Sequence, residues 1–405
     1  MVLPIVTPAP VVAFHAEAFR DLFDNQCEFR HFQNYLTGLM VLENTSMANI
    51  SNCILTSADK TNLSRFFSEA PWHEQETNDR RIRYMLDQTA PHRRPAKESS
   101  LILDDTLCEH VGSLFEYVDR HYDHCDHSYP LAHNLVSSFY LSGAVRFPVD
   151  ARLYRRYEEI TQWPAFVQKH FPDRAIPKEK KPRQRLHKEV DPTLLKDPEF
   201  ELLHEQFKTK ISLAQEMIQG AIEHDIPFKT VLMDSWYLSE DLVKTLADRG
   251  KDWVSLLKKN RKVESHSFTL RDAQGHAIPF SKPHVKVEDL VPLIPKCSYK
   301  KVTISEQHYW CFTLTVRIPS LGKVRLVISY DNSDLEGTYA ILISNRTDGS
   351  AKKMITAYLQ RWPIETFYQD QYLRQNGFFF SSRRRHTRYG ALRCYQYTIY
   401  GMSSR

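Results

Sequence analysis

Residues 100–106 read SLILDDT, an apolar run that ends in two adjacent carboxylates. Residues 228–234, FKTVLMD, repeat the pattern and end in Asp234. Short apolar runs of this kind are typical of strands buried on both faces of a sheet. A carboxylate at such a position is costly to bury unless it meets a cation or a proton. The two runs therefore predict neighbouring strands whose ends, at Asp104 and Asp234, form a site for a hard cation.

The pattern around these runs predicts an α/β fold. Further along the chain, the pattern predicts a β-rich stretch over Asn134–Phe147 and an amphipathic helix over Asp197–Glu223. It then predicts a second helix over Glu240–Asp248 and a short strand over Trp253–Leu257. Alternating apolar and polar residues then predict a β-rich insertion. We expect an N-terminal helical domain over 1–95 and the first part of the core over 96–265. The β-rich insertion follows over 266–345, a helix completing the core over 346–377, and a non-native tail over 378–405.

The N-terminal domain has two open interpretations. Its later part contains three large aromatic residues and three arginines: Phe66, Phe67, Trp72, Arg80, Arg81 and Arg83. A helix-turn-helix that grips DNA uses such residues. A structural helical bundle is the alternative.

Composition excludes several classes of protein. The apolar and charged fractions, 42% and 25%, are those of an ordinary globular chain and not of a disordered one. No apolar run approaches the ~20 residues of a membrane span. The seven cysteines are scattered without a CxxC pair, so we expect reduced thiols and a cytoplasmic protein. We also expect the protein to be nucleoid-associated and to have no membrane partner.

Positive charge is concentrated in one proline-containing segment, residues 172–188. The prolines predict an exposed linker and not a regular helix, and the charge would let it lie along DNA phosphates. The residues we expect to contact DNA there are Lys180, Lys181, Arg183 and Arg185. A merely solvated linker is the alternative.

A third carboxylate is expected from residues 357–372, AYLQRWPIETFYQDQY. On one helix, Tyr358, Arg361, Glu365 and Tyr372 fall within an arc of about 60°. The guanidinium and phenol suit a DNA phosphate, and the carboxylate suits a metal ion. Pro363 predicts a kink or a fresh helix start just before the glutamate.

Three ordered motifs resemble one known family. Tyr358-x2-Arg361-x3-Glu365 resembles the Y-R-E-K signature of DDE transposases of the insertion-sequence-four superfamily. SLILDDT is similar to the strand of the family's first aspartate, and VLMDSWY to that of the second. The spacings, 130 residues (234 − 104) and 131 residues (365 − 234), leave room for the β insertion.

The resemblance implies a ribonuclease H-like core interrupted by β-strands, and Asp104, Asp234 and Glu365 as catalytic ligands of Mg²⁺ or Mn²⁺. Asp105 competes with Asp104 as the metal ligand. The implied reaction is metal-dependent cleavage at transposon ends, followed by attack of the freed 3′-hydroxyl on target DNA. Tyr358 and Arg361 would hold double-stranded DNA, with the chain acting as a homodimer. Trp362 would stack an extruded base, or else pack in the core.

The signature is incomplete, because Tyr372 stands where the family has its lysine. Two alternatives therefore remain open: a metal-dependent DNA nuclease without strand transfer, and a catalytically inactive DNA-binding remnant.

The tail is unlike the rest of the chain. Residues 378–388, FFFSSRRRHTR, resemble the conceptual translation of a thymine run joined to a sequencing-library adapter. On this interpretation the native sequence stops near Gly377 and the family's last helices are missing. A genuine basic DNA-binding tail is the alternative.

Overall fold

The computed structural model describes residues 4–55, 60–110, 117–123 and 126–373. The predicted non-native tail and the side chain of Tyr372 lie outside this description. Contacts along the chain divide it into two compact units. The first comprises Met1–Asp104, Ser137–Ala151 and Ala214–Arg405, and the second comprises Asp105–Val136 and Arg152–Leu213.

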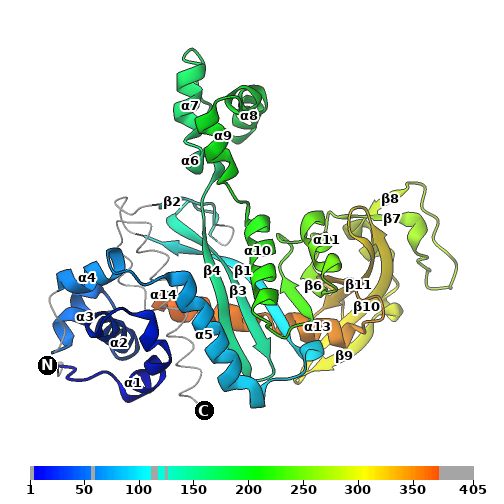
Figure 1. Cartoon of the computed structure of the whole chain (residues 1–405). Helices are drawn as coiled ribbons and strands as arrows, with labels where there is room; N and C mark the ends of the chain where they lie inside the picture. Colours follow the sequence, from blue (N-terminus) through cyan, green and yellow to red (C-terminus); the bar gives the residue numbers. More distant parts are fainter. Residues whose placement is uncertain (1–3, 56–59, 111–116, 124–125, 374–405) are drawn as a thin grey trace. The chain divides into compact units, whose positions relative to one another are not determined.

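Within the described residues, a ten-stranded sheet has the order β2-β3-β1-β5-β6-β12-β11-β10-β9, with β4 paired to β3 (Figure 1). β1, β5 and β6 run parallel, whereas β6, β12, β11, β10 and β9 pair antiparallel in turn. The strands are β1 (Ser100–Glu109), β2 (Asp119–Arg120), β3 (Leu131–Ser142), β4 (Val145–Tyr154), β5 (Thr230–Met233), β6 (Asp252–Leu256), β9 (Lys300–Ile304), β10 (Gln307–Ile318), β11 (Gly322–Tyr330) and β12 (Tyr339–Ser344). This mixed sheet with its helices confirms the predicted α/β class.

The four strands predicted from alternation, β9 to β12, extend the main sheet. β12 pairs with β6 through Leu342↔Leu256 and Ser344↔Val254. This pairing continues one sheet, so the strands need no separate sheet of their own. The preceding stretch holds shorter elements: β7 (Lys262–Glu264), β8 (His284–Lys286) and α12 (Val287–Leu290). The proposed domain limits remain a prediction.

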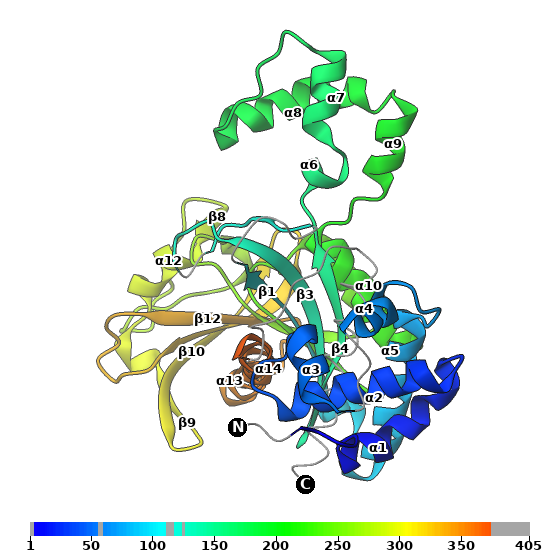
Figure 2. The same ribbon diagram turned by 90° about the vertical axis from the view of Figure 1, so that its left-hand side faces the viewer.

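Helices cover both faces of the sheet. They include α10 (Lys210–Glu223), α11 (Glu240–Asp248), α13 (Ala351–Leu359) and α14 (Trp362–Leu373). Figures 1 and 2 show α13 and α14 on the opposite side of the sheet from α10. α14 is fixed there by Ile364, Phe367 and Tyr368, which are buried in one cluster with residues of β1, β3, β5 and β6: Ile102, Phe139, Leu141, Leu232 and Val254. Of the described helices, none has the length and apolarity needed to cross a membrane.

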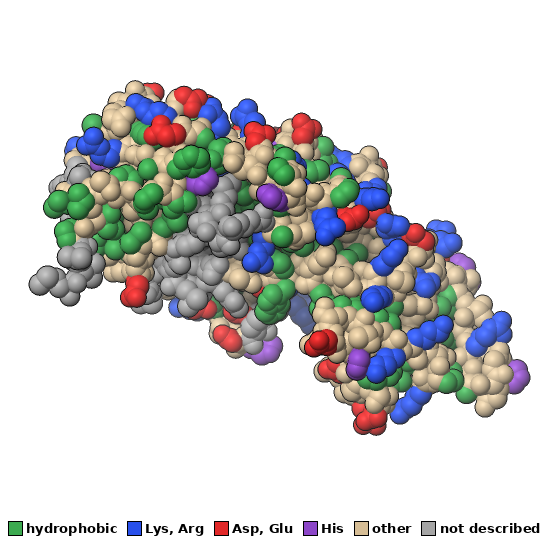
Figure 3. Space-filling model, turned by 90° about the horizontal axis from the view of Figure 1, so that it is seen from below, with side chains coloured by type: hydrophobic (Ala, Val, Ile, Leu, Met, Phe, Trp, Pro, Cys, Tyr) green, Lys and Arg blue, Asp and Glu red, His purple; other side chains and the backbone are tan. Residues whose placement is uncertain are grey.

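The N-terminal helices form a bundle around an aromatic core. They are α1 (Pro10–Ala16), α2 (Gln26–Val41), α3 (Met47–Cys53), α4 (Lys60–Ser68) and α5 (Glu74–Thr89). Phe66, Phe67 and Trp72 are buried in this core, so they do not reach a DNA surface. The face shown in Figure 3 nevertheless has apolar side chains gathered over these helices. In α1, Phe14 is exposed.

The arginines of α5 are also largely structural. Arg81 is 1% exposed and donates to the carbonyls of Pro148 at 2.7 Å and Val149 at 2.9 Å, both in β4. Arg80 pairs with Asp21 at 2.7 Å. Arg81 therefore anchors the bundle to the sheet, and of the three arginines singled out in the sequence Arg83 alone is exposed.

The second unit contains four helices between β4 and α10: α6 (Tyr157–Ile160), α7 (Trp163–His170), α8 (Lys180–Leu194) and α9 (Pro198–Glu205). The prediction of a basic linker without a regular helix is confirmed for residues 172–179 and was wrong for residues 180–188, which begin α8. Pro182 is the third residue of α8, in the first turn, where backbone N–H groups have no helical partner to lose. The single helix predicted over Asp197–Glu223 is also divided, into α9 and α10.

We expect Arg81→Leu to lower the free energy of unfolding by about 3 kcal/mol, because it removes the buried guanidinium that donates to two carbonyls of β4, of which Val149 keeps Asn78 as a donor. Urea unfolding followed by circular dichroism measures this loss. Arg83→Leu, the same change at an exposed position of α5, should stay within about 0.5 kcal/mol of the parent. Equal losses in the two variants would contradict the anchoring role.

Candidate active site

The parallel pairing of β1 with β5 sets the position of two aspartates. The paired residues are Ser100↔Thr230, Leu101↔Val231 and Ile102↔Leu232, each pair 130 residues apart (230 − 100). The same spacing separates Asp104 from Asp234, so this register brings the two side by side. β1 continues to Glu109, which corrects the expectation that Asp104 ends its strand; Asp234 does follow the last residue of β5.

Arg361 links Asp104 to Glu365. One guanidinium nitrogen, Nη1, donates to Asp104 Oδ2, and the other, Nη2, donates to Glu365 Oε1 at 2.6 Å. Asp104 is only 9% exposed, so its charge needs this compensation. Asp104 of β1 and Glu365 of α14, which are 261 residues apart (365 − 104), therefore meet through one side chain.

Asp234 is oriented by the turn that follows β5. Its Oδ1 accepts from the backbone N–H groups of Trp236 at 2.9 Å and Tyr237 at 3.2 Å. The Ser255 hydroxyl, on the neighbouring strand β6, donates to the Asp234 carbonyl at 2.9 Å. Such local bonds to the backbone fix the direction in which an aspartate points.

Tyr358 lies among these charges. Burial raises the pKa of its phenol to about 12, and the negative charges of Asp234 and Asp104 act in the same direction, against Arg361. The pKa of Arg361 is also raised: burial lowers it, but Asp104, Tyr358 and Glu365 outweigh burial. At neutral pH the site thus presents a protonated phenol and a charged guanidinium, both hydrogen-bond donors.

The helix before Glu365 is broken, as Pro363 predicted. α13 ends at Leu359 and α14 begins at Trp362, with Pro363 as its second residue. The prediction that Tyr358, Arg361 and Glu365 share one face of a single helix is therefore wrong. Tyr358 belongs to α13, Arg361 to the connection between the helices, and Glu365 to the beginning of α14. The three side chains still meet, because the break lets the turn present Arg361 between the two acids.

Asp105 has a different partner from its neighbour. Lys210 Nζ, on α10, donates to Asp105 Oδ2 at 2.6 Å. Successive side chains of a strand point to opposite faces, which separates Asp105 from the face of Asp104. This contact favours Asp104 over Asp105 as the residue that works with Glu365.

The residues fit a divalent cation by chemistry, since three carboxylates supply the oxygen ligands that Mg²⁺ and Mn²⁺ prefer. Among the described residues, however, no three His, Cys, Asp or Glu side chains converge on a common metal position. Arg361 occupies one oxygen each of Asp104 and Glu365. A metal ion that used all three acids would have to displace the guanidinium.

Two exposed tryptophans adjoin the site in sequence. Trp362, at the start of α14, is 65% exposed, so core packing is not its role. Trp236, two residues after Asp234, is 44% exposed and was missed by the sequence reasoning. The sequence signal was a large aromatic residue two positions after a site aspartate, in VLMDSWY.

The four basic residues predicted to contact DNA belong to α8, in the second unit. Arg183 is engaged by Glu158, whereas Lys180, Lys181 and Arg185 are exposed.

Comparison with known families gives two matches. A family described as DDE superfamily endonuclease matches residues 18–278, and one described as transposase DDE domain matches residues 208–378. The first covers more than half of the chain, and together they include Asp104, Asp234 and Glu365. A search of curated proteins found no match.

We expect Arg361→Leu to lower the free energy of unfolding by about 2 kcal/mol in metal-free buffer, because Asp104 loses its compensating charge. Added MgCl₂ should narrow this deficit, since a bound cation replaces the missing positive charge. Urea unfolding with and without MgCl₂ tests both statements. Lys352→Leu, at an exposed position of α13, serves as the matched control. A deficit in Arg361→Leu that is no larger than the control's would rule out the counter-ion role.

Proposed function

The chain belongs to the DDE superfamily of endonucleases as a DDE-type transposase, and on this premise we propose that Asp104, Asp234 and Glu365 catalyse cleavage of DNA at transposon ends and strand transfer into target DNA. The observation that carries the proposal is the meeting of the motif residues from β1 and α14 at Arg361, beside the strand that delivers Asp234. The mixed α/β sheet is consistent with a ribonuclease H-like core of that superfamily.

DDE enzymes use divalent metal ions, and Asp104, Asp234 and Glu365 are the residues that would hold Mg²⁺ or Mn²⁺ here. Such ions activate the attacking hydroxyl and stabilise the leaving oxygen of an in-line phosphoryl transfer. The short chain segment between β5 and Trp236 would keep Asp234 directed into the site, because its carboxylate is held by two backbone N–H groups.

Tyr358 and Arg361 would bind the DNA backbone. A guanidinium suits a phosphate because it donates two parallel hydrogen bonds, and the same geometry serves carboxylates. Arg361 can therefore exchange its carboxylate partners for a phosphate without losing a charge partner. Tyr358 would donate its proton to a neighbouring phosphate oxygen, which its raised pKa keeps available up to strongly alkaline pH.

Trp362 would contact a base or sugar near the cleaved bond. An exposed aromatic ring stacks on any base, and such contacts are worth about 1–3 kcal/mol per base. We also propose that two copies of the chain act together as a homodimer on double-stranded DNA, one at each transposon end.

We expect Asp104→Asn, Asp234→Asn and Glu365→Gln each to lower metal-dependent nicking of duplex DNA by at least about 100-fold, because each removes a charged ligand. Nicking of a supercoiled plasmid with Mg²⁺ or Mn²⁺, and its loss in EDTA, provides the measurement. Asp105→Asn is the matched control: its carboxylate is paired with Lys210, so nicking should fall far less. If Asp105→Asn is the more damaging change, the assignment of Asp104 is wrong.

Strand transfer is tested separately, with duplexes that copy the ends of the encoding element and carry a free 3′-hydroxyl. We expect the parent chain to join them covalently to plasmid DNA in Mg²⁺, and Glu365→Gln to form no joined product, since cleavage and joining share one site. Nicking without joining would indicate the nuclease alternative. DNA binding with neither reaction would indicate an inactive remnant.

A further inference from the structure

The helix α8 has one face packed into the second unit. Leu186, Val190 and Leu194 are buried there, at spacings of four residues that keep them on one side of the helix. Residues from α7 and α9 complete this apolar cluster: Trp163, Phe166, Val167 and Phe200. The opposite side of α8 is therefore directed away from the cluster.

That opposite side carries Lys181, Arg185 and Lys188, all exposed. At about 100° per residue these three positions fall within an arc of about 60°, centred roughly 180° from Val190. They span about 10 Å of the helix axis, a length over which duplex DNA carries about six phosphate charges. We call these three residues the basic face.

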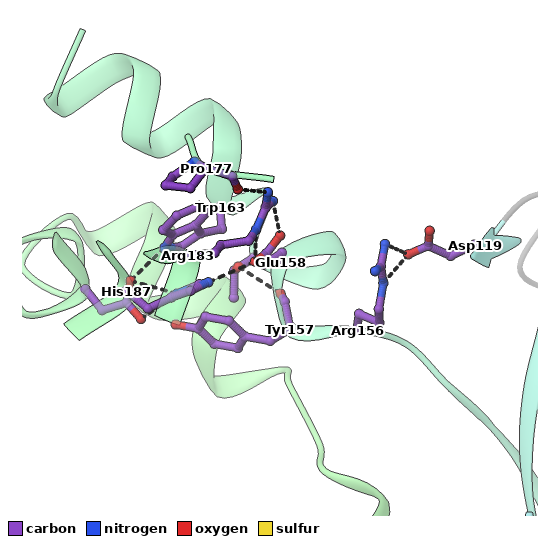
Figure 4. Close-up of polar contacts among 10 residues, drawn as sticks. Asp119, Arg156, Tyr157, Glu158, Trp163, Pro177, Arg183 and His187 are labelled. Carbon is purple, nitrogen blue, oxygen red and sulfur yellow. Dashed lines mark hydrogen bonds and ion pairs between the residues drawn. The ribbon is translucent and has the colours of Figure 1, made fainter. Parts of the chain in front are cut away.

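Two further basic side chains of α8, those of Arg183 and His187, point inward, as Figure 4 shows, whereas Lys180 at the start of the helix is exposed. Arg183 donates to Glu158 of α6 at 2.6 Å and to the Pro177 carbonyl at 3.0 Å. His187 lies 2.9 Å from the same Glu158 and stacks on Trp163 with ring centroids 3.9 Å apart. The basic run seen in the sequence is thus divided into an internal set, which fixes the rotation of α8, and an external set.

A carboxylate of α8 completes this internal network. Asp191 accepts from the indole N–H of Trp163 at 2.6 Å and lies 3.0 Å from His187 Nδ1. Bonds to α6 and α7 from one helix leave it little freedom to rotate. The orientation of the basic face is therefore set by contacts inside the unit.

The charge of the basic face is not neutralised within the described chain, where none of its three residues forms an ion pair. Its acidic neighbour Glu189 pairs with Arg174. The apolar side of α8 is buried, so the helix lacks the exposed apolar face that a membrane-surface helix requires. What remains is an ordered row of cations suited to a regular polyanion.

We propose that the basic face of α8 binds the phosphate backbone of duplex DNA without regard to its sequence. This inference rests on the proposed function, in which DNA is the substrate. Of the four residues predicted from the sequence it keeps Lys181 and Arg185. Lys180 lies outside the arc of the basic face, and Arg183 is replaced by Lys188 because Arg183 is committed to Glu158. The second unit would thereby give the chain a DNA contact additional to Tyr358 and Arg361.

The test is the salt dependence of DNA binding by the full-length chain carrying Lys181→Gln, Arg185→Gln and Lys188→Gln together. Each phosphate contact contributes about 0.9 to the slope of log K against log salt, so the slope should fall by about 2–3. Fluorescence anisotropy with two duplexes of unrelated sequence, in EDTA so that no cleavage occurs, measures it. Both duplexes should lose affinity equally.

Lys169→Gln is the matched control. It removes one positive charge from α7 of the same unit, but from a lysine already paired with Asp197, so it should lower the slope by less than any single basic-face variant. Thermal unfolding confirms that the exposed substitutions leave the fold unchanged. An unchanged slope in the triple variant, or a loss confined to one duplex, would overturn the proposal.

Plasmid nicking at saturating DNA separates this proposal from the proposed function. If the parent chain itself fails to nick, the proposed function fails, while the salt slope still decides whether the basic face binds DNA.

Discussion

Parallel pairing of β1 with β5 is the constraint on which the site depends. A parallel ladder fixes which residues lie opposite one another, and here its offset equals the spacing of Asp104 and Asp234. A slip of one residue would send every side chain of a strand to the other face, exchanging Asp104 for Asp105. Buried residues on both strands, including Leu101, Ile102, Val231 and Leu232, make that slip costly, so the hydrophobic core also holds the carboxylates in register.

This arrangement places negative charges close together at low exposure, and Arg361 offsets their repulsion. The break between α13 and α14 matters for that reason: Pro363 prevents one continuous helix, and the turn it creates presents the guanidinium to acids from two elements. α14 is in turn fixed by Ile364 and Phe367 against the sheet. Packing, a helix break and charge compensation thus act on the same few residues, and a guanidinium that satisfies carboxylates is also suited to phosphates.

In the second unit, too, paired charges set the orientation of a structural element. Glu158 and Asp191 hold Arg183, His187 and Trp163 together, and this network sets which side of α8 faces outward. Cations that are paired inside a unit stabilise it, and cations that lack a carboxylate partner are available to other molecules. The same residue type therefore has two roles, decided by what lies next to it.

The sequence by itself determined the α/β class, the strands at 100–106 and 228–233, the four later strands and the helix start at Pro363, because apolar periodicity and proline act locally. Its ordered motifs also predicted Asp104, Asp234 and Glu365 as the site carboxylates. Local pattern misjudged α8, since prolines in a first turn cost little, and could not tell Arg183 from Lys188 or Asp105 from Asp104. Those distinctions depend on partners distant in the chain, Glu158 for Arg183 and Lys210 for Asp105, and only tertiary structure decides which charges meet.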